Sequence, residues 1–418
     1  MNFSIILWAV AAFMVVTLVL VALLLFAKAK LTSSGSVKID INEGNKVLEV
    51  ESGSTLLNTL SEQGIFLPSA CGGKGACGQC KCQVVSGGGE ILPTERGFFN
   101  RRQINEGWRL GCQVKVKEDM QIKVPASVLS IKKWECEVVS NHNVATFIKE
   151  FVVKLPEGET LNFRSGGYIQ IDIPAYKEIK FSDMDIDPKF HADWTKFKMW
   201  DLVANNPEPT FRAYSMANQP AEDDIIMLNV RIATPPFDRA TGGFMNINPG
   251  ICSSYVFSRK PGDKINISGP YGEFFIKPTP NEKMFIGGGA GMAPMRSHIM
   301  HLFKTLKTGR KVNFFYGARS LKEAFYLDDY YQIEKEFPNF KFHLALDRPD
   351  PEADKAGVPY VPGFVHNVLY ETYLKNHDEP EGIIYLMCGP PMMAQSVVNL
   401  LDSLGVPAEN ILFDNFGA

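Results

Sequence analysis

Four cysteines near the start of the chain limit what it can fold into. Cys71, Cys77 and Cys80 follow the pattern C-x5-C-x2-C, and Cys112 comes after a further 31 residues. The first three lie in a glycine-rich stretch, SACGGKGACGQC. A [2Fe–2S] cluster needs four cysteine thiolates, and glycines let the backbone come close to its sulfides. The pattern therefore predicts that these four cysteines hold a [2Fe–2S] cluster.

Other interpretations of the cysteines fit less well. The plant-type cluster spacing is C-x4-C-x2-C, so the loop here is one residue longer. Structural zinc sites use paired C-x2-C units, and only one such pair stands here beside Cys71 and Cys112. A disulfide framework suits small secreted chains, and unrelated buried thiols do not explain the glycine-rich spacing. The remaining early thiols are expected to serve packing, namely Cys82, Cys136 and Cys252.

Length and composition favour a multidomain globular protein. The chain has 418 residues, which is room for about three domains. Its hydrophobic fraction of 45% and charged fraction of 21% are those of folded domains. A net charge of -3, with no basic stretch rich in aromatic residues, argues against nucleic acid as a partner. The free thiols of a cluster site favour a reducing compartment.

The N-terminal segment predicts a single membrane-spanning helix. Residues 5–26 are apolar except for Thr17, and as a helix they would extend about 33 Å, enough to cross a bilayer. A cleaved signal peptide is the alternative, but no Lys or Arg precedes this run, which also exceeds the usual signal length. Lys28 and Lys30 follow the run, so the rest of the chain is expected in the cytoplasm. We assign residues 1–31 to this anchor.

Three further domains are expected after a short polar linker. Residues 36–126 read as a small α+β (β-grasp-like) domain around the cysteines. Residues 130–277 read as short β segments with turns between them, which favours an antiparallel β-barrel. In residues 281–418 strands alternate with helices, which favours a parallel α/β sheet.

Residues 175–210 fit the barrel poorly and are interpreted as an insertion. The run Asp183-x-Asp185-x-Asp187 begins like a calcium loop, but Pro188 stands where glycine is needed and Trp194 where glutamate is needed, so calcium is excluded. Two interpretations stay open. The insertion is either a partner-docking surface or an excursion that folds back over its own apolar side chains, Trp194, Phe197, Met199 and Trp200.

Several motifs suit nucleotide cofactors. In Arg212-Ala213-Tyr214-Ser215 the arginine could bind a diphosphate, the tyrosine could lie against a flavin, and the hydroxyl could hydrogen-bond it, although a surface arginine beside a strand tyrosine is the simpler alternative. Gly250 precedes a plausible helix start, Ile251-Cys252-Ser253, whose backbone N–H groups could bind phosphate.

A glycine-rich turn and a late cysteine complete the set of motifs. The run from Ile286 through Gly288, Gly289, Gly291 and Met292 joins a short strand to the amphipathic stretch Met295–Leu306, as at pyrophosphate sites, although it departs from G-x-G-x-x-G and could be a simple turn. Cys388-Gly389-Pro390 follows the last predicted strand, where open α/β sheets bind ligands, and its thiol could pack or contact a nicotinamide.

These motifs, in this order, resemble those of the ferredoxin–NADP reductase superfamily over residues 130–418. The resemblance implies FAD and a nicotinamide nucleotide as cofactor and substrate, and it implies roles for the motif residues. It places Arg212, Tyr214 and Ser215 on the flavin, Gly250, Ile251, Cys252 and Ser253 on its diphosphate, and Gly288, Gly289, Gly291 and Met292 on the dinucleotide. It also places Cys388, Gly389 and Pro390 near the nicotinamide, and Phe416 over the flavin ring, with Ser215, Cys388 and Phe416 taking part in catalysis.

With its cysteine domain, leading helix and insertion, the whole chain is similar to the NADH-oxidising subunits of sodium-translocating NADH:quinone oxidoreductases. That resemblance implies hydride transfer from NADH to FAD and single electrons through the cluster to membrane partner subunits, at a bacterial inner membrane. The segment Gly317–Tyr326 resembles NADH-type members, although Lys322 leaves NADPH open. A membrane-associated oxygenase reductase and a cofactor-free scaffold subunit remain as alternatives.

Overall fold

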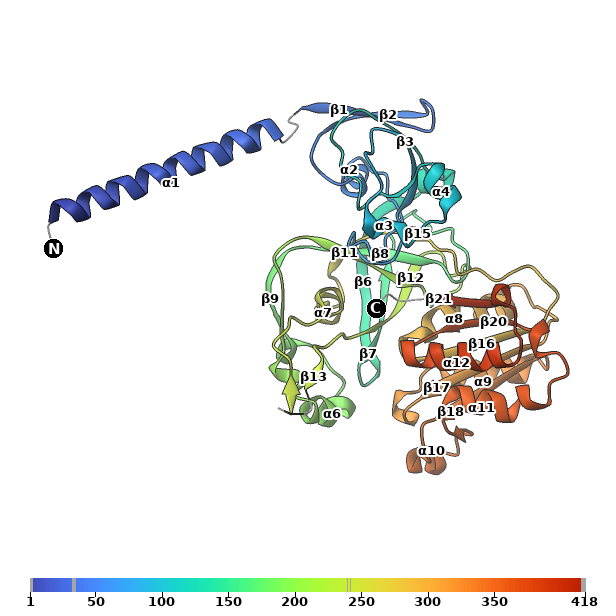
Figure 1. The fold of residues 1–418 in the computed structure, drawn as a ribbon. Coiled ribbons are helices and arrows are strands. Elements are labelled where there is room, and N and C mark those ends of the chain that lie inside the picture. The colour runs from blue at the N-terminus through green and yellow to red at the C-terminus, as the bar shows by residue number, and fades with distance from the viewer. Residues whose placement is uncertain (1–2, 32–34, 239, 241, 415–418) are drawn as a thin grey trace. The chain divides into compact units, whose positions relative to one another are not determined.

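The computed structural model describes residues 3–31, 35–238, 240 and 242–414, and within the first helix it describes side chains at Trp8 and at 10–23. Contacts divide the chain into two compact units (Figure 1). The first comprises Met1–Ser69 and Gly73–Ser130, and the second comprises Ala70–Gly72 and Ile131–Ala418. Phe416 lies outside the described residues.

The first unit begins with helix α1 (Phe3–Leu31). Its large apolar side chains at the described positions are exposed, among them Phe13 and Leu18, and the hydroxyl of Thr17 donates to the Phe13 carbonyl at 2.8 Å. Within the residues described, the structure contains no helix that combines the length and the apolar character needed to cross a membrane. The span expected over residues 5–26 therefore stays a prediction.

A five-stranded sheet of order β2-β1-β5-β3-β4 forms the body of the first unit. β1 and β5 run parallel and the other pairs run antiparallel. Helix α2 begins after Thr55, whose hydroxyl accepts from the Asn58 N–H at 3.3 Å. The elements are β1 (Ser36–Ile41), β2 (Lys46–Glu51), α2 (Leu56–Glu62), β3 (Lys81–Ser86), α3 (Pro93–Arg96), α4 (Arg101–Asn105), β4 (Trp108–Leu110), β5 (Met120–Lys123) and α5 (Ala126–Leu129).

The second unit opens with an antiparallel six-stranded sheet of order β11-β8-β15-β6-β7-β12. An isolated bridge between Met216 and Leu228 links the two edge strands, β11 and β12. Inward-facing residues alternate along β12, where Ile226, Leu228 and Val230 are fully buried. The elements are β6 (Lys132–Ala145), β7 (Ile148–Lys154), β8 (Tyr168–Ile173), β11 (Thr210–Ser215), β12 (Ile225–Arg231), α7 (Ile251–Ser258) and β15 (Lys264–Tyr271), with the short pair β13 (Phe237–Asp238) and β14 (Gly243–Phe244).

The segment 175–210 folds back onto this sheet. It forms strand β9 (Tyr176–Lys180), helix α6 (His191–Lys196) and strand β10 (Val203–Asn206), with β9 and β10 paired. Trp194 is fully buried in the apolar core of the sheet, and its indole N–H donates to the Thr146 carbonyl at 2.8 Å. Of the two interpretations left open, the structure agrees with the folded-back one for Trp194 and Met199, both of which are buried.

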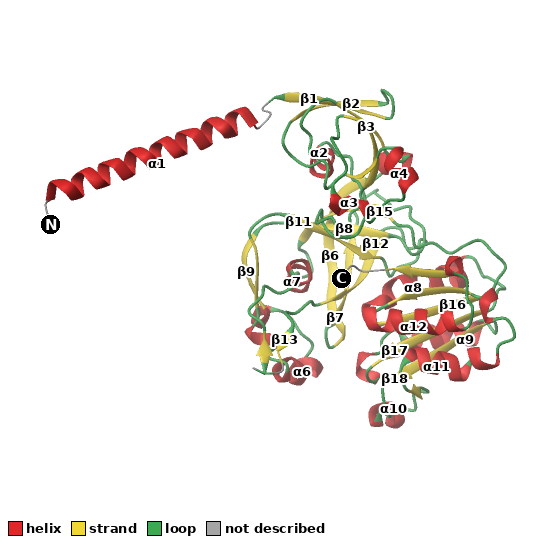
Figure 2. Cartoon of the chain, in the orientation of Figure 1, coloured by secondary structure: helices red, strands yellow, loops and turns green. Residues whose placement is uncertain are grey.

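A six-stranded parallel sheet of order β19-β18-β17-β16-β20-β21 completes the second unit, with helices on both faces (Figure 2). Neighbouring residues of one strand enter opposite cores: Phe314 packs with α8 and α9, and Phe315 packs with α11 and α12. Burial on both faces explains the continuous apolar runs. The elements are β16 (Lys283–Gly288), α8 (Met292–Met300), β17 (Val312–Ala318), α9 (Leu327–Glu336), β18 (Phe340–Leu346), α10 (Pro351–Ala356), β19 (Val361–Pro362), α11 (Val365–Thr372), β20 (Ile384–Cys388), α12 (Pro391–Ser403) and β21 (Ile411–Asp414).

Candidate functional site

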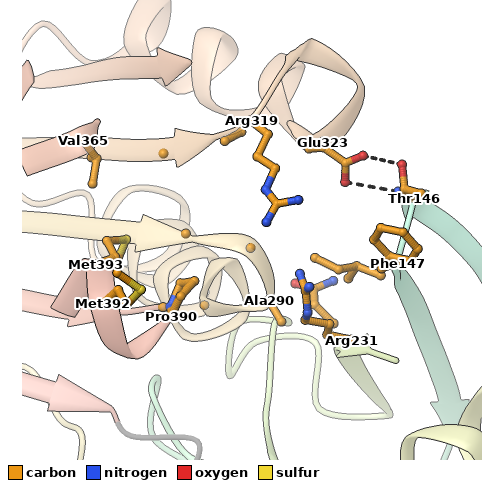
Figure 3. A pocket seen from close by; sticks show the side chains of 18 of the residues that line it. Thr146, Phe147, Arg231, Ala290, Arg319, Glu323, Val365, Pro390, Met392 and Met393 are labelled. Atoms are coloured by element: carbon orange, nitrogen blue, oxygen red, sulfur yellow. Dashed lines mark hydrogen bonds between the residues drawn. The ribbon is translucent and has the colours of Figure 1, made fainter. Parts of the chain in front are cut away.

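A large cavity of about 1030 Å³ lies in the second unit (Figure 3). One side comes from β11, β12 and the turn between β6 and β7, together with α6 of the insertion. The other comes from the carboxyl ends of β16, β17 and β20. The order of the strands reverses at β16, and in open α/β sheets ligands bind at this point. The cavity is large enough for a dinucleotide.

The glycine-rich turn after β16 forms the floor of this cavity. Gly288, Gly289 and Gly291 line it, and helix α8 begins directly after them. A Cβ atom at Gly291 would lie 2.1 Å from the Cys388 carbonyl oxygen, so only glycine allows α8 to approach β20. Met292 is fully buried and accepts a hydrogen bond from the Tyr330 hydroxyl through its sulfur at 2.9 Å, so its side chain does not line the cavity.

The predicted flavin motif reaches the cavity through two of its residues. Tyr214 and Ser215 line it. The guanidinium of Arg212, which is not among the lining residues, donates to the Phe211 carbonyl at 2.7 Å and to the Thr210 hydroxyl at 3.1 Å. Burial raises the pKa of the Tyr214 hydroxyl, so the ring stays neutral and suited to stacking.

Gly250, Ile251, Cys252 and Ser253 form the start of α7 and are not among the cavity's lining residues. The Ser253 hydroxyl accepts from the Ala233 N–H at 3.0 Å and donates to the Gly250 carbonyl at 3.1 Å. The side chain of Ser253 therefore fixes the turn, and any phosphate contact here would come from backbone N–H groups.

Ser215 is paired with a carboxylate that the sequence motifs did not single out. Its hydroxyl donates to Asp414 Oδ2 at 2.7 Å, and burial raises the pKa of Asp414 to about 6 although this hydrogen bond opposes the shift. Parallel pairing of β20 with β21 sets Asp414 opposite Cys388. The sequence alone assigned Asp414 no role, because its contact with Ser215 joins residues that are far apart in the chain.

The Cys388 thiol is fully buried, and the cavity wall at this point consists of Gly389, Pro390 and the following residues. Burial, reinforced by the charge of Asp414, raises the pKa of the Cys388 thiol well above its usual value. The thiol is therefore protonated and packed beneath the wall.

Charged side chains line the opposite end of the cavity (Figure 3). Arg231 and Arg319 both reach into it, and burial together with the charge of Arg319 lowers the pKa of Arg231. Glu323 accepts hydrogen bonds from the Thr146 hydroxyl and from the Thr146 N–H, the latter at 3.3 Å. Two arginines facing one space suit an anionic ligand such as a diphosphate. Arg231 ends β12, whose other residues are apolar except for Asn229, and this terminal charge is the signal by which the sequence could have revealed it.

In the first unit the cysteine loop brings thiols together. Hydrogen bonding to Cys112, together with burial, raises the pKa of the Cys80 thiol, and Cys77 acts on it in the same direction. Gly78, beside Cys77, has φ +68°, and a Cβ there would lie 2.3 Å from the Phe98 ring. The Cys71 segment, Ala70–Gly72, groups with the second unit.

The donor set suits an iron–sulfur cluster. Among the side chains that the structure describes, no three histidine, cysteine, aspartate or glutamate groups are arranged to hold a metal ion. A [2Fe–2S] centre shares its four ligands between two irons, and soft thiolates on a glycine-rich loop match it in chemistry.

Family models match three parts of the chain. Residues 39–117 match the 2Fe-2S iron-sulfur cluster binding domain, residues 196–276 the oxidoreductase FAD-binding domain, and residues 285–399 the oxidoreductase NAD-binding domain. Among solved structures, the Amycolatopsis cytochrome P450 reductase GcoB is similar, with TM-score 0.61 and 23% identity over 91% of this chain and 98% of that one. The ferredoxin reductase in carbazole 1,9a-dioxygenase has TM-score 0.57 and 24% identity over the same shares. These two likenesses show the fold alone.

Fold and family models together define an oxidoreductase with a 2Fe–2S domain joined to an FAD- and NAD-binding module. Full-length relatives are more specific. The F subunit of the Na(+)-translocating NADH-quinone reductase in Pseudomonas aeruginosa is 54% identical over 98% of each chain, and its counterpart in a Marinomonas species is 53% identical over 100% of this chain and 99% of that one. The chain belongs to this family of reductase subunits, which confirms the resemblance seen in the sequence.

Proposed function

We propose that this chain oxidises NADH and delivers the electrons singly to a membrane-bound, sodium-pumping quinone reductase complex. The observation that carries the proposal is the cavity in which Tyr214 and Ser215 of β11 face the glycine turn after β16 and the Gly389 end of β20. When bound there, FAD accepts a hydride from NADH and releases electrons one at a time, which a [2Fe–2S] cluster can accept.

Different residues of the cavity would bind the pyrophosphate, the flavin ring and the nicotinamide. The glycine turn and the start of α8 would hold the nucleotide pyrophosphate, with Arg231 and Arg319 neutralising its charge. Tyr214 would support the flavin ring and Ser215, held by Asp414, would hydrogen-bond its reacting edge. Cys388 and Gly389 would shape the nicotinamide pocket, and Phe416 would cover the flavin until nicotinamide arrives.

Cys71, Cys77, Cys80 and Cys112 would hold the cluster. The role of the protein there is to bury the centre and to tune it through hydrogen bonds to sulfur. Gln113 already donates to the Cys112 sulfur at 3.6 Å, and such a contact would influence the reduction potential.

We also propose that residues 5–26 anchor the chain in the bacterial inner membrane as a single span. The support comes from the sequence, which is apolar over this run and has Lys28 and Lys30 directly after it. That orientation leaves the catalytic domains in the cytoplasm, beside NADH and next to the membrane subunits that receive the electrons.

Purified protein mixed anaerobically with NADH tests this function. We expect the flavin absorbance to bleach and a reduced [2Fe–2S] signal to develop in low-temperature electron paramagnetic resonance. In Cys77→Ala the cluster signal should be absent while NADH still bleaches the flavin. A colourless protein, or one whose flavin NADH leaves oxidised, would refute the proposal.

A further inference from the structure

A lysine at the nucleotide end of the cavity is held by the insertion. Lys322 lies in the short turn Leu321–Glu323 that follows β17, and its ammonium pairs with the carboxylate of Asp193 on α6. The two side chains are 29% and 31% exposed. The ammonium also lies 5.3 Å from the centre of the Phe190 ring, itself fully buried in the insertion. Two insertion residues thus fix one cation of the NAD-binding half.

The position of this turn connects the Lys322–Asp193 pair with nucleotide binding. Pro390 and Met393 lie on one side of the cavity, and Arg319, which follows β17, lies on the other side with Glu323 (Figure 3). In dinucleotide-binding sheets the residues after the second strand read the ribose 2′ position, where an acidic group favours a free hydroxyl and a basic group accommodates a 2′-phosphate. Because β17 is the second strand of this sheet, Lys322 lies in the turn where that reading occurs.

The turn Leu321–Glu323 presents an anion to the cavity, beside Arg319, which precedes the turn and also lines the cavity. Glu323 lines the cavity, and Thr146 holds its carboxylate through two hydrogen bonds (Figure 3). A carboxylate oxygen can accept further hydrogen bonds from ribose hydroxyls, whereas it repels a phosphate. Asp193, which itself lines the cavity, pairs with Lys322, and Lys322 is not among the lining residues.

We propose that Asp193 determines selectivity for NADH over NADPH by holding Lys322 away from the 2′-phosphate position. This inference rests on the proposed function and gives the insertion a role at its active site. Asp193 acts through Lys322 and is a positioning residue, not a catalytic one.

Asp193→Asn tests the idea, because it removes the charge and keeps the shape. We expect the ratio of kcat/KM for NADPH to that for NADH to rise about tenfold, since a freed lysine can form a charge-assisted hydrogen bond to phosphate. Independently of flavin chemistry, calorimetry should show 2′-phospho-ADP-ribose gaining affinity relative to ADP-ribose by a similar factor. Asp201→Asn, an exposed carboxylate of the same insertion, should leave both ratios unchanged.

A second variant separates selectivity from structural support. Asp193→Asn combined with Lys322→Gln should return both ratios to the parent value, because the freed cation is then absent. If Asp193→Asn leaves the two ratios unchanged while NADH still reduces the flavin, the inference is wrong and the ion pair only braces the insertion. If NADH reduces the flavin in neither the parent nor the variant, it is the proposed function that fails.

Discussion

Ser215 depends on Asp414 for its orientation. Without a partner, a serine hydroxyl rotates freely, but here it donates to a carboxylate at 2.7 Å. Burial raises the pKa of that carboxyl from 3.8 to about 6. Its protonation therefore changes close to physiological pH, and below this pKa Asp414 can act as a donor itself.

The rate of flavin reduction by NADH should consequently depend on Asp414. As pH rises through about 6 the carboxyl ionises and accepts the single proton of the Ser215 hydroxyl, which is then no longer available to the flavin, so we expect the stopped-flow rate to fall from a plateau at lower pH. Asp414→Asn should remove this transition. Asp402→Asn, which changes an exposed carboxylate on α12, serves as control and should keep the parent profile. A pH transition near 6 that survives in Asp414→Asn would assign it to another group.

At the scale of single residues, the sequence pointed to those candidate site residues that belong to a local motif. Tyr214, Ser215 and the glycine turn, which their motifs singled out, line the cavity, and their contacts with flavin and dinucleotide stay predictions. Asp414 and Asp193 were missed because their roles arise from pairing with residues distant in sequence, Ser215 and Lys322 respectively. Local sequence patterns do not reveal contacts between residues that are far apart in the chain.

Within the first unit, a buried ion pair ties helix α3, strand β4 and the loop at Gly88–Gly89 together. Arg109 donates to the carboxylate of Glu95 and to the carbonyls of Gly88 and Gly89, at 2.8 and 3.0 Å. Glu95 also accepts from the N–H groups of Leu92 and Leu110. Burial opposes ionisation of Glu95, yet the hydrogen bonds from Arg109 and the two N–H groups outweigh it and lower its pKa.

Replacing Arg109 should destabilise the first unit more than the second. Arg109→Ala leaves the Glu95 charge buried without its partner, and we expect the free energy of unfolding to fall by about 3 to 5 kcal/mol. Chemical denaturation, monitored through the absorbance of the cluster, measures this free energy of unfolding. Arg102→Ala removes an exposed pair with Glu106 in the same unit and should have a much smaller effect. Equal losses in the two variants would show that burial of the Glu95 pair contributes nothing.

Elements with strong local signals were predicted well. The strands of the parallel sheet read as apolar runs because both their faces are buried, as Phe314 and Phe315 demonstrate. The helix expected over Met295–Leu306 begins earlier, at Met292, and gives way to a π-helical turn after Met300. The insertion stayed ambiguous because burial of Trp194 depends on the strand core beneath it, which its own sequence does not encode.

For the whole molecule, membrane attachment should be separable from chemistry. A chain lacking residues 1–31 should stay in the supernatant after high-salt washing and ultracentrifugation, while NADH still bleaches its flavin. The physical reason is that the apolar run ends before the first folded strand, β1, which begins at Ser36. Membrane association that persists in the shortened chain would instead point to docking through the folded domains.

The burial of the thiols outside the cluster loop affects how the protein withstands turnover in the presence of oxygen. Cys82, Cys136, Cys252 and Cys388 are all buried, and burial raises the pKa of Cys82 and of Cys136 to about 12. Such groups hold almost no thiolate at neutral pH, so peroxide and superoxide formed by stray reaction of oxygen would find little to attack there. The buried thiols of this electron carrier are thereby protected from oxidation by such by-products.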